Sequence, residues 1–340
     1  MTCNNDWEQL KEVIVGTADF ATIPHPNISV MKCHFPEYTD ELIWPHTGLL
    51  PKKIRDEQNE DLDKLAEVLK QLGVIVHRPD TRYWDRFTCG PVWNGDNWHY
   101  HCPRDLTLVV GNTLIETPSP IWNRQFETLG YRDIFTKLFN EGYNWVKAPV
   151  PVLHKDNYKI NTKGVPALNN EEILFEAANC VRVNNDILYQ VSNTGNELGA
   201  KWLQRTLGDK YKVHVAKNLY SYAHLDSTIV PLREGLVCYN ASRVTAENEP
   251  ELFKSWDKIW ITECVGPDKP PLGMPWGASA WIGMNLLSIN ENLAIVDKKQ
   301  TQIHEKLNAV GIETIPLELR HDRVISGGFH CVTLDLQRGS

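Results

Sequence analysis

Apolar positions along the chain recur in one phrase: a helix, then a glycine, then a strand. The clearest copy has apolar residues at helical spacing from Leu62 to Leu72, followed by Gly73 and the apolar run Val74–Val76. Glycine commonly ends a helix, and a short β-branched run after it favours a strand. The same phrase returns at 134–146 around Gly142, at 202–215 around Gly208, at 252–261 with Asp257 in place of the glycine, and at 307–315 around Gly311.

A second phrase, two apolar strands about a polar turn, alternates with the first. Its copies run over 106–115 around Gly111, 181–191 around Asn184, 229–238 around Gly235 and 286–296 around Asn290. Asparagine and glycine tolerate the positive φ that tight hairpins need. The chain is therefore predicted to use a unit of strand, turn, strand, helix and strand about five times.

The two ends of the chain supply strands that would complete a ring of such units. Val13–Val15 can pair with Val332–Leu334. We therefore predict a single α/β domain over residues 1–340, built as a closed five-unit α/β propeller of ββαβ repeats with pseudo-fivefold symmetry. An open doubly wound sheet is the competing fold, but a hairpin in every unit argues against it, and closure leaves few exposed strand edges.

The chain has 340 residues, of which 42% are hydrophobic and 23% charged, and a net charge of −8. This composition argues against a disordered chain, a coiled coil or a nucleic-acid partner. The apolar runs are shorter than the roughly 18 residues of a membrane span, so no membrane association is expected. The eight cysteines are scattered and the N-terminus lacks a basic and apolar leader. We therefore expect reduced thiols in a cytoplasmic protein.

The residues just before the first strands of successive units carry the candidate chemistry. They are Asp105, Glu176, His224 with Asp226, Ser279 and Cys331. In a ring of units these positions would converge on one cavity. A structural protein has little reason to gather carboxylates, because each raises the pKa of its neighbours. An enzyme that binds a cation beside a thiol nucleophile does have such a reason.

Each of these residues also has a simpler interpretation. Asp105 could start a strand or form an ion pair, and Asp226 has His224 two residues before it on the same strand face. Glu176 could be a solvated surface acid. A lone cysteine is usually a small buried hydrophobe, although the double glycine before Cys331 would let backbone approach a ligand closely. Their coincidence in the repeat favours function.

Two further segments resemble known sites only loosely. His99, His101 and Cys102 resemble a metal site, but no fourth ligand lies at the spacing of a structural zinc site, so no metal is predicted. The segment Gly195–Gly199 resembles a phosphate loop but lacks the Gly-Lys-Ser/Thr ending, so it is predicted to open a helix instead. No cofactor is predicted.

Several separated motifs resemble the L-arginine-dependent amidinotransferases, in order, over residues 7–338. They are Cys102–Asp105, Asn193–Leu207, His224–Leu232, Trp281–Asn285 and Gly327–Cys331. Within the family the chain is most similar to the inosamine-phosphate amidinotransferases and less similar to the glycine amidinotransferases. The resemblance implies the family's five-unit, pentein-like α/β propeller, which agrees with the repeat.

The resemblance also implies a reaction. The amidino group of L-arginine would move to a primary amine through a covalent amidino-cysteine, by a ping-pong scheme that releases ornithine. The implied roles are nucleophile for Cys331, acid and base for His224, orientation of that histidine for Glu176, guanidinium binding for Asp105 and Asp226, and contacts to the amino-acid end for Arg243 and Ser279. Where the family usually has Asp, this chain has Glu176, and a second family serine falls at Ala278.

The acceptor amine is left open by the sequence. Ser221 and Ala223, just before His224, are expected to line the cavity mouth and to leave room for an acceptor larger than glycine. The resemblance favours an aminocyclitol phosphate, with lysine or another amine of natural-product biosynthesis as alternatives. The competing functions are an arginine deiminase-type hydrolase, a non-catalytic propeller that binds a small cation, and a metal hydrolase using His99, His101 and Cys102. A homodimer is compatible with all of them.

Overall fold

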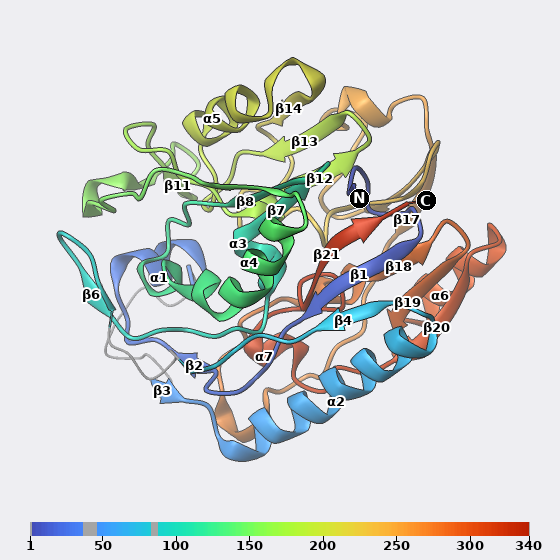
Figure 1. Ribbon diagram of the computed structural model, residues 1–340, viewed down its shortest axis with the longest axis horizontal. Coiled ribbons are helices and arrows are strands. Elements are labelled where there is room, and N and C mark those ends of the chain that lie inside the picture. Colours follow the sequence, from blue (N-terminus) through green and yellow to red (C-terminus); the bar gives the residue numbers. More distant parts are fainter. Residues whose placement is uncertain (1, 37–45, 83–87, 340) are drawn as a thin grey trace.

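Five three-stranded sheets with one shared strand order form most of the molecule (Figure 1). The computed structural model describes residues 2–36, 46–82 and 88–339. In each sheet the first two strands are antiparallel and the third joins the second in parallel. The strands are β7 (Thr107–Val110), β8 (Thr113–Glu116) and β9 (Asn144–Lys147); β12 (Cys180–Val183), β13 (Asp186–Gln190) and β14 (Lys212–Ala216); β15 (Ile229–Arg233), β16 (Leu236–Asn240) and β17 (Asp257–Ile261); β18 (Leu287–Asn290), β19 (Leu293–Asp297) and β20 (Glu313–Leu317); and β21 (Thr333–Arg338), β1 (Leu10–Val15) and β4 (Ile75–His77).

A helix joins the second and third strands in four of the five sheets. These helices are α2 (Lys52–Gln71), α4 (Arg132–Asn140), α5 (Glu197–Leu207) and α6 (Thr301–Ala309). The glycine that follows each of them has a positive φ, between 68° and 99°, as the repeat predicts. Helix α5 begins after Asn196, whose side chain accepts from the Gly199 amide, so the Gly195–Gly199 segment opens a helix as expected.

The predicted helix at 252–256 is wrong. A 3-10 turn, Glu251–Phe253, replaces it, and Asp257 begins β17 rather than ending a helix. Pro250 precedes the turn and the strand starts at 257, so too few residues remain to nucleate an α-helix. Phe253 is nevertheless buried and keeps the packing position that a helix residue would fill.

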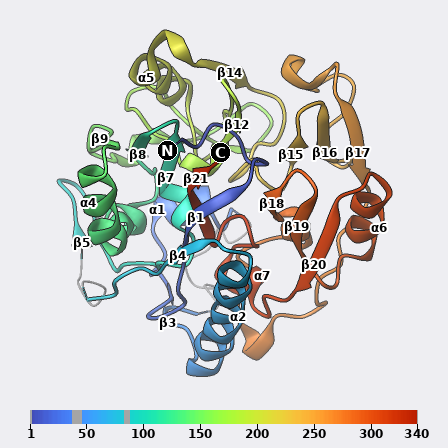
Figure 2. The ribbon, with the colours of Figure 1, turned by 45° about the vertical axis from the view of Figure 1, so that its right-hand side comes forward.

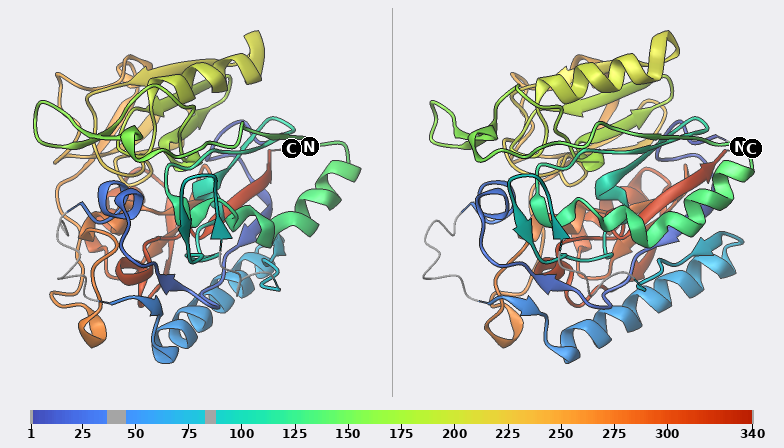
Figure 3. Two further views of the ribbon diagram at one scale, coloured as in Figure 1. Left: turned by 90° about the vertical axis from the view of Figure 1, so that its left-hand side faces the viewer. Right: turned by 60° about the vertical axis from the view of Figure 1, so that its left-hand side comes forward.

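The two ends of the chain meet in one sheet. Strand β21 pairs antiparallel with β1, with Ile14 opposite Leu334 and Val15 opposite Thr333, which confirms the predicted pairing. Figure 2 shows both termini beside the middle of the molecule, where the first strands of the sheets also lie. The third strands lie further out. Helices α2 and α5 cover opposite sides of the molecule (Figure 3).

The core lies between each helix and its sheet. Leu62, Leu65 and Leu69 of α2 pack in one apolar cluster with Val13 and Val15 of β1. Each fully buried leucine contributes on the order of 1.5–3 kcal/mol to folding. Among the described residues, no helix is both long and apolar enough to cross a membrane.

The remaining α-helices and strands are short and connect the sheets and the longer helices. They are α1 (Ile28–Cys33), α3 (Pro103–Leu106), α7 (Asp322–Ile325), and the two-stranded pairs β2 (Thr22–Ile23) with β3 (Gly48–Leu49), β5 (Thr88–Cys89) with β6 (Asn94–Gly95), and β10 (Tyr158–Ile160) with β11 (Pro166–Leu168).

Candidate active site

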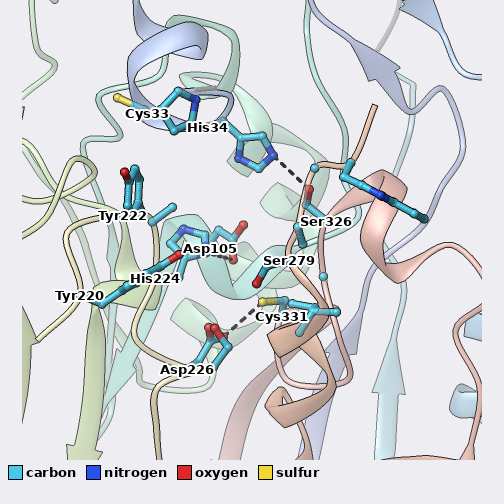
Figure 4. Close-up of a pocket in the computed structure, with 18 of the residues that line it drawn as sticks. Cys33, His34, Asp105, Tyr220, Tyr222, His224, Asp226, Ser279, Ser326 and Cys331 are labelled. Atoms are coloured by element: carbon cyan, nitrogen blue, oxygen red, sulfur yellow. Dashed lines mark hydrogen bonds and ion pairs between the residues drawn. The ribbon is translucent and has the colours of Figure 1, made fainter. Parts of the chain in front are cut away.

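A cavity of about 630 Å³ opens where the first strands of the sheets begin. Five of the residues singled out in the sequence line it together: Asp105, His224, Asp226, Ser279 and Cys331. Figure 4 shows their side chains turned toward one another across the cavity. The predicted convergence is therefore present for these five residues, whereas Glu176 contacts His224 and does not itself line the cavity.

The loop that carries Cys331 is held in an unusual backbone conformation. Ser326 has a φ of 65° and Gly327 a φ of 153°. A β-carbon on Gly327 would lie 2.6 Å from the Cys102 sulfur, so only glycine fits there. The Cys331 amide donates to Asn285 Oδ1 at 2.8 Å, and its thiol donates to Asp226 Oδ2 at 3.2 Å. The loop thus fixes the sulfur at the cavity wall.

The surroundings of Cys331 favour its neutral thiol. A hydrogen bond with Cys102, burial, and the charges of Asp226 and Asp105 raise the pKa of Cys331 well above its ordinary value, while His224 opposes them. A thiolate therefore needs added positive charge in the cavity.

His224 lies in the loop before β15 with a φ of 70°, so the expectation that it shares a strand face with Asp226 is wrong. The tight turn aims its ring into the cavity. Its Nε2 lies 2.7 Å from Glu176 Oε2 and its Nδ1 lies 3.7 Å from Asp105 Oδ1. Burial lowers the pKa of His224, but Asp105, the Cys331 thiol and Glu176 together raise it well above its ordinary value. These neighbours therefore favour the imidazolium form of His224.

Glu176 is 1% exposed, so the interpretation as a solvated surface acid is wrong. Its Oε1 accepts from the Ser119 hydroxyl at 2.6 Å and lies 3.4 Å from Arg124 Nη1. Burial would raise the pKa of Glu176, but Arg124 and the hydrogen bond with His224 lower it to about 2. The longer glutamate side chain thus still reaches the histidine.

Asp105, in α3, has one carboxylate oxygen in an ion pair and one without a hydrogen-bond donor among the described residues. Its Oδ2 lies 2.9 Å from Arg124 Nη1. Among the described residues, no hydrogen-bond donor reaches its buried Oδ1. Burial and the carboxylates of Glu176 and Asp226 raise the pKa of Asp105, against the lowering effect of His224 and Arg124. A cationic ligand would relieve this repulsion.

Arg124 is a residue of the site that the sequence reasoning missed. It lines the cavity and joins Asp105, Glu176 and Glu127, whose Oε2 lies 2.9 Å from Arg124 Nη2. The three-residue spacing of Arg124 and Glu127 is a local signal for an ion pair, but nothing in the sequence shows that the pair reaches the cavity.

Asp226 has its Oδ2 between two donors. The His330 ring donates from Nδ1 at 2.9 Å, and the Cys331 thiol donates at 3.2 Å. Burial would raise the pKa of Asp226, but the hydrogen bond and charge of His330, with the charge of His224, hold it below its ordinary range. His330 was also missed, although it lies beside Cys331 in the sequence.

Arg243 sits in the half-buried outer part of the cavity. Its guanidinium stacks on the Tyr220 ring at 3.7 Å and donates to Thr228 Oγ1 at 2.9 Å. Ser279 Oγ lies 3.5 Å from its Nη2. Within the described ranges no carboxylate forms an ion pair with Arg243. Burial lowers its pKa, yet an arginine remains charged at neutral pH.

The two residues expected at the cavity mouth differ in position. Ala223 lines the cavity, whereas Ser221 is exposed and does not. The Ser221 carbonyl accepts from the Asn193 amide at 2.9 Å, which turns this residue outward. Tyr220, Tyr222 and Ala278 line the cavity as well.

The buried residues His99, His101 and Cys102 have partners of their own. His101 Nε2 lies 2.9 Å from Gln58 Nε2, and Cys102 Sγ donates to the Ser326 carbonyl at 3.0 Å. Over the described ranges, the ligand atoms that could hold a metal ion together are those of Asp105, His224 and Cys331, all within 4.8 Å of one another. The predicted alternative set therefore does not form such a group.

Comparison with known proteins finds relatives that match nearly the whole chain. Inosamine-phosphate amidinotransferase 1 of Streptomyces griseus is 43% identical, over 99% of this chain and 97% of its own, and a solved structure of this Streptomyces griseus enzyme superposes with a TM-score of 0.94. The L-arginine:L-lysine amidinotransferase of Pseudomonas savastanoi pv. phaseolicola is 33% identical, over 98% of this chain and 93% of its own. No protein-family model matches the sequence.

A more remote likeness concerns the fold alone. The dimethylarginine dimethylaminohydrolase of Pseudomonas aeruginosa is 14% identical and superposes with a TM-score of 0.58 over 96% of this chain and 99% of its own. This likeness supports the α/β pentein fold for the chain.

Proposed function

The chain belongs to the amidinotransferases, which are transferases, and we propose that it moves the amidino group of L-arginine to a primary amine by way of Cys331. The observation that carries the proposal is the group of reactive atoms on Cys331, His224 and Asp105, all within 4.8 Å of one another. Buried carboxylates surround this group, and they match a planar cation better than a neutral substrate.

Binding of arginine is the step that activates the nucleophile. Asp105 and Asp226 accept the paired N–H groups of the guanidinium, and Arg243 with Ser279 binds the carboxylate at the other end. The added cation beside the sulfur offsets the carboxylates that hold the pKa of Cys331 high, so with substrate in place the thiol releases its proton to solvent and the thiolate forms.

In the first half-reaction the Cys331 thiolate attacks the guanidinium carbon and a C–S bond forms. The bond from that carbon to the ornithine nitrogen then breaks, and the His224 imidazolium gives its proton to the leaving amine. Glu176, 2.7 Å from the ring, holds His224 in orientation. Ornithine leaves, and the amidino group stays on the sulfur.

In the second half-reaction an acceptor amine attacks the same carbon. The now neutral His224 takes a proton from the amine, and the C–S bond breaks to return the thiolate. Donor and acceptor thus use one cavity in turn, a ping-pong scheme. The cavity has room beyond Ala223 and Tyr222 for an acceptor larger than glycine, and an aminocyclitol phosphate or lysine, the acceptors named for the relatives, are the first to test.

For the fold we propose that the five sheets form one closed five-unit propeller domain over residues 1–340. The pairing of β21 with β1 supports closure, as do the contacts of β12 with β15, of β18 with β1 and of β7 with β21. A homodimer and a cytoplasmic location stay predictions, which light scattering and cell fractionation measure.

The test is incubation with L-arginine and no acceptor, followed by peptide mass analysis. We expect an adduct of roughly 42 Da on the Cys331 peptide and release of ornithine. The Cys331→Ala variant is the control and should give neither. Accumulation of citrulline would instead support the deiminase-type hydrolase, and unchanged arginine would support a non-catalytic propeller.

A further inference from the structure

Behind Asp226, on the side away from the substrate cavity, the His330 ring lies between two carboxylates. Its Nδ1 is 2.9 Å from Asp226 Oδ2 and its Nε2 is 3.9 Å from Asp6 Oδ1. A neutral imidazole donates from only one nitrogen, whereas an imidazolium donates from both. Both nitrogens face carboxylate oxygens and the side chain is 12% exposed, so the arrangement fits the charged form.

The backbone of His330 is fixed, which limits how far its ring can turn. Its amide donates to the Asn285 carbonyl at 3.1 Å, and its carbonyl accepts from Arg104 Nε at 2.8 Å. Arg104 belongs to α3, and Asn285 precedes β18. The backbone that carries the ring is therefore held by two other segments of the fold.

The charged groups around His330 and Asp226 come from several elements. They are Asp6 in the N-terminal segment, Arg104 and Asp105 in or next to α3, Arg182 in β12, His224 and Arg243 toward the cavity, and Cys331 and Asp335 on the last segment. Arg182 pairs with both Asp6 and Asp335, and Arg104 also lies within ion-pair distance of Asp6, so the charge of Asp6 is shared among these two arginines and His330. Of the basic groups among them, the His330 ring is the one in direct contact with Asp226, and it adds a positive charge there when protonated.

Asp226 needs such a cation because it lies among like charges. Asp105 and Glu176 are buried in the same site, and the pKa of Asp105 is raised in part by Asp226 and Glu176. Arg124 offsets the charge of Asp105 and Glu176 and forms no ion pair with Asp226 among the described residues. Without a partner of its own, Asp226 would take up a proton and lose its attraction for a guanidinium.

We propose that His330 is a positioning residue for amidino transfer: its imidazolium keeps Asp226 ionised and holds Oδ2 beside the sulfur, leaving Oδ1 for the guanidinium. This inference rests on the proposed function, in which Asp226 binds the substrate cation. Within the Gly327–Cys331 motif, Cys331 is then the nucleophile and His330 supplies the counter-charge for Asp226.

Two substitutions separate the charge of His330 from its hydrogen bond. His330→Asn keeps an N–H donor near Asp226 but removes the charge, and His330→Leu removes both. We expect His330→Leu to lower kcat/KM for arginine about 100-fold, because it leaves a buried carboxylate unpaired. His330→Asn should lose less. In both variants the acid limb of the kcat/KM profile should move up by about one pH unit or more, because the pKa of Asp226 rises when the cation is lost.

A matched control is His77, whose Nε2 lies 2.6 Å from Glu12 Oε1 and whose side chain is 18% exposed, outside the cavity. His77→Leu should leave the acid limb unchanged. A fall in kcat/KM without a moved acid limb in the His330 variants would show a merely structural role and overturn the proposal. So would kcat/KM within twofold of the wild type.

Binding of arginine to Cys331→Ala, measured by calorimetry, makes the inference independent of turnover. Adding His330→Leu to this background should weaken binding about tenfold or more at pH 6 and less at pH 9. Equal affinity in the two proteins would overturn the proposal. If the wild type binds arginine but releases no ornithine, the proposed function fails while the calorimetry still decides on His330. If Cys331→Ala binds no arginine, both fail. Melting temperatures check that each variant is folded.

Discussion

Both carboxylates that line the described cavity lie in its inner part, beside Arg124 and His224, whereas the charged groups of the outer part are cations alone. The inner part holds Asp105 and Asp226, with Cys331 between them, and all three are nearly fully buried. The outer part is lined by the half-buried cations Lys32, Arg243 and Arg323. Among the described lining residues, Asp105 and Asp226 are the carboxylates, so no acid offsets the outer cations.

This difference in charge sets the orientation in which a ligand fits the cavity. An amino acid with a cationic side chain and an anionic head, such as arginine, fits with the guanidinium inward and the carboxylate outward. In the proposed reaction the bonds change at the inner end, where Cys331 and His224 lie, and the head of the amino acid is bound at the outer end. Substitutions in the two parts should therefore have effects of different kind as well as of different size.

The largest effect is expected at the inner end, from Cys331→Ala. Loss of the sulfur removes the atom that carries the amidino group, so transfer should fall by about 10⁴-fold or more. Ornithine release and the acceptor product, followed by liquid chromatography, measure it. Arginine should still bind, because the carboxylates remain. Transfer at near wild-type rate would contradict the covalent scheme.

Substitution of His224 should be the next most damaging. His224→Asn removes the proton donor for ornithine and the base for the acceptor, and we expect about a 10³-fold lower kcat with a smaller change in KM. Single-turnover release of ornithine isolates the first step. If the defect lay in KM alone, His224 would be a binding residue and not the acid.

Glu176 tests how far orientation of His224 matters. Glu176→Gln removes the negative charge 2.7 Å from the ring, so the pKa of His224 falls and kcat should drop about 10²-fold. Glu176→Asp keeps the charge and shortens the side chain by one methylene, and it should retain more activity than Glu176→Gln. A greater loss in Glu176→Asp than in Glu176→Gln would show that distance, not charge, is decisive.

At the outer end, Arg243→Gln should raise KM for arginine by about tenfold and change kcat little, because a charged hydrogen bond to the carboxylate is lost. Agmatine, which lacks that carboxylate, is the matched substrate: its KM should be the same for the variant and the wild type. A large loss of kcat with agmatine would mean that Arg243 also acts at the inner end.

The smallest effect is expected from pH in the wild type. The pKa of His224 is raised, so the imidazolium is present at neutral pH and ornithine release should decline only as the pH rises through that raised value. Glu176, with a pKa of about 2, should add no acid limb above pH 4. Single-turnover rates from pH 6 to 10 measure this, and a rate that rises steadily to pH 10 would contradict it.

The sequence was a good guide where function follows the repeat. The unit of strands and helix, the glycines after the helices, and the meeting of Asp105, His224, Asp226, Ser279 and Cys331 all follow from position within a unit. Each such residue precedes a first strand, and first strands share one end of the molecule. The periodicity of the sequence is therefore sufficient to predict that these residues meet.

The sequence was a poor guide where function depends on irregular loops. Arg124 lies in a short 3-10 turn between units, and only packing brings its guanidinium to Asp105 and Glu176. Ser221 and Ala223 lie on a loop without a repeating backbone, so the inward position of one and the outward position of the other have no pattern to predict them. The helix expected at 252–256 does not form because that segment is too short for one.

The pairing of β21 with β1 has a consequence for the order in which the protein becomes active during synthesis. The proposed nucleophile, Cys331, lies directly before β21. Strand β21 has to pair with β1, which is synthesised more than three hundred residues earlier. Contacts of such large sequence separation form slowly. Earlier units can fold as they emerge from the ribosome, but the reactive thiol is set in place only when the last strand joins the first, so arginine is not consumed by an unfinished chain.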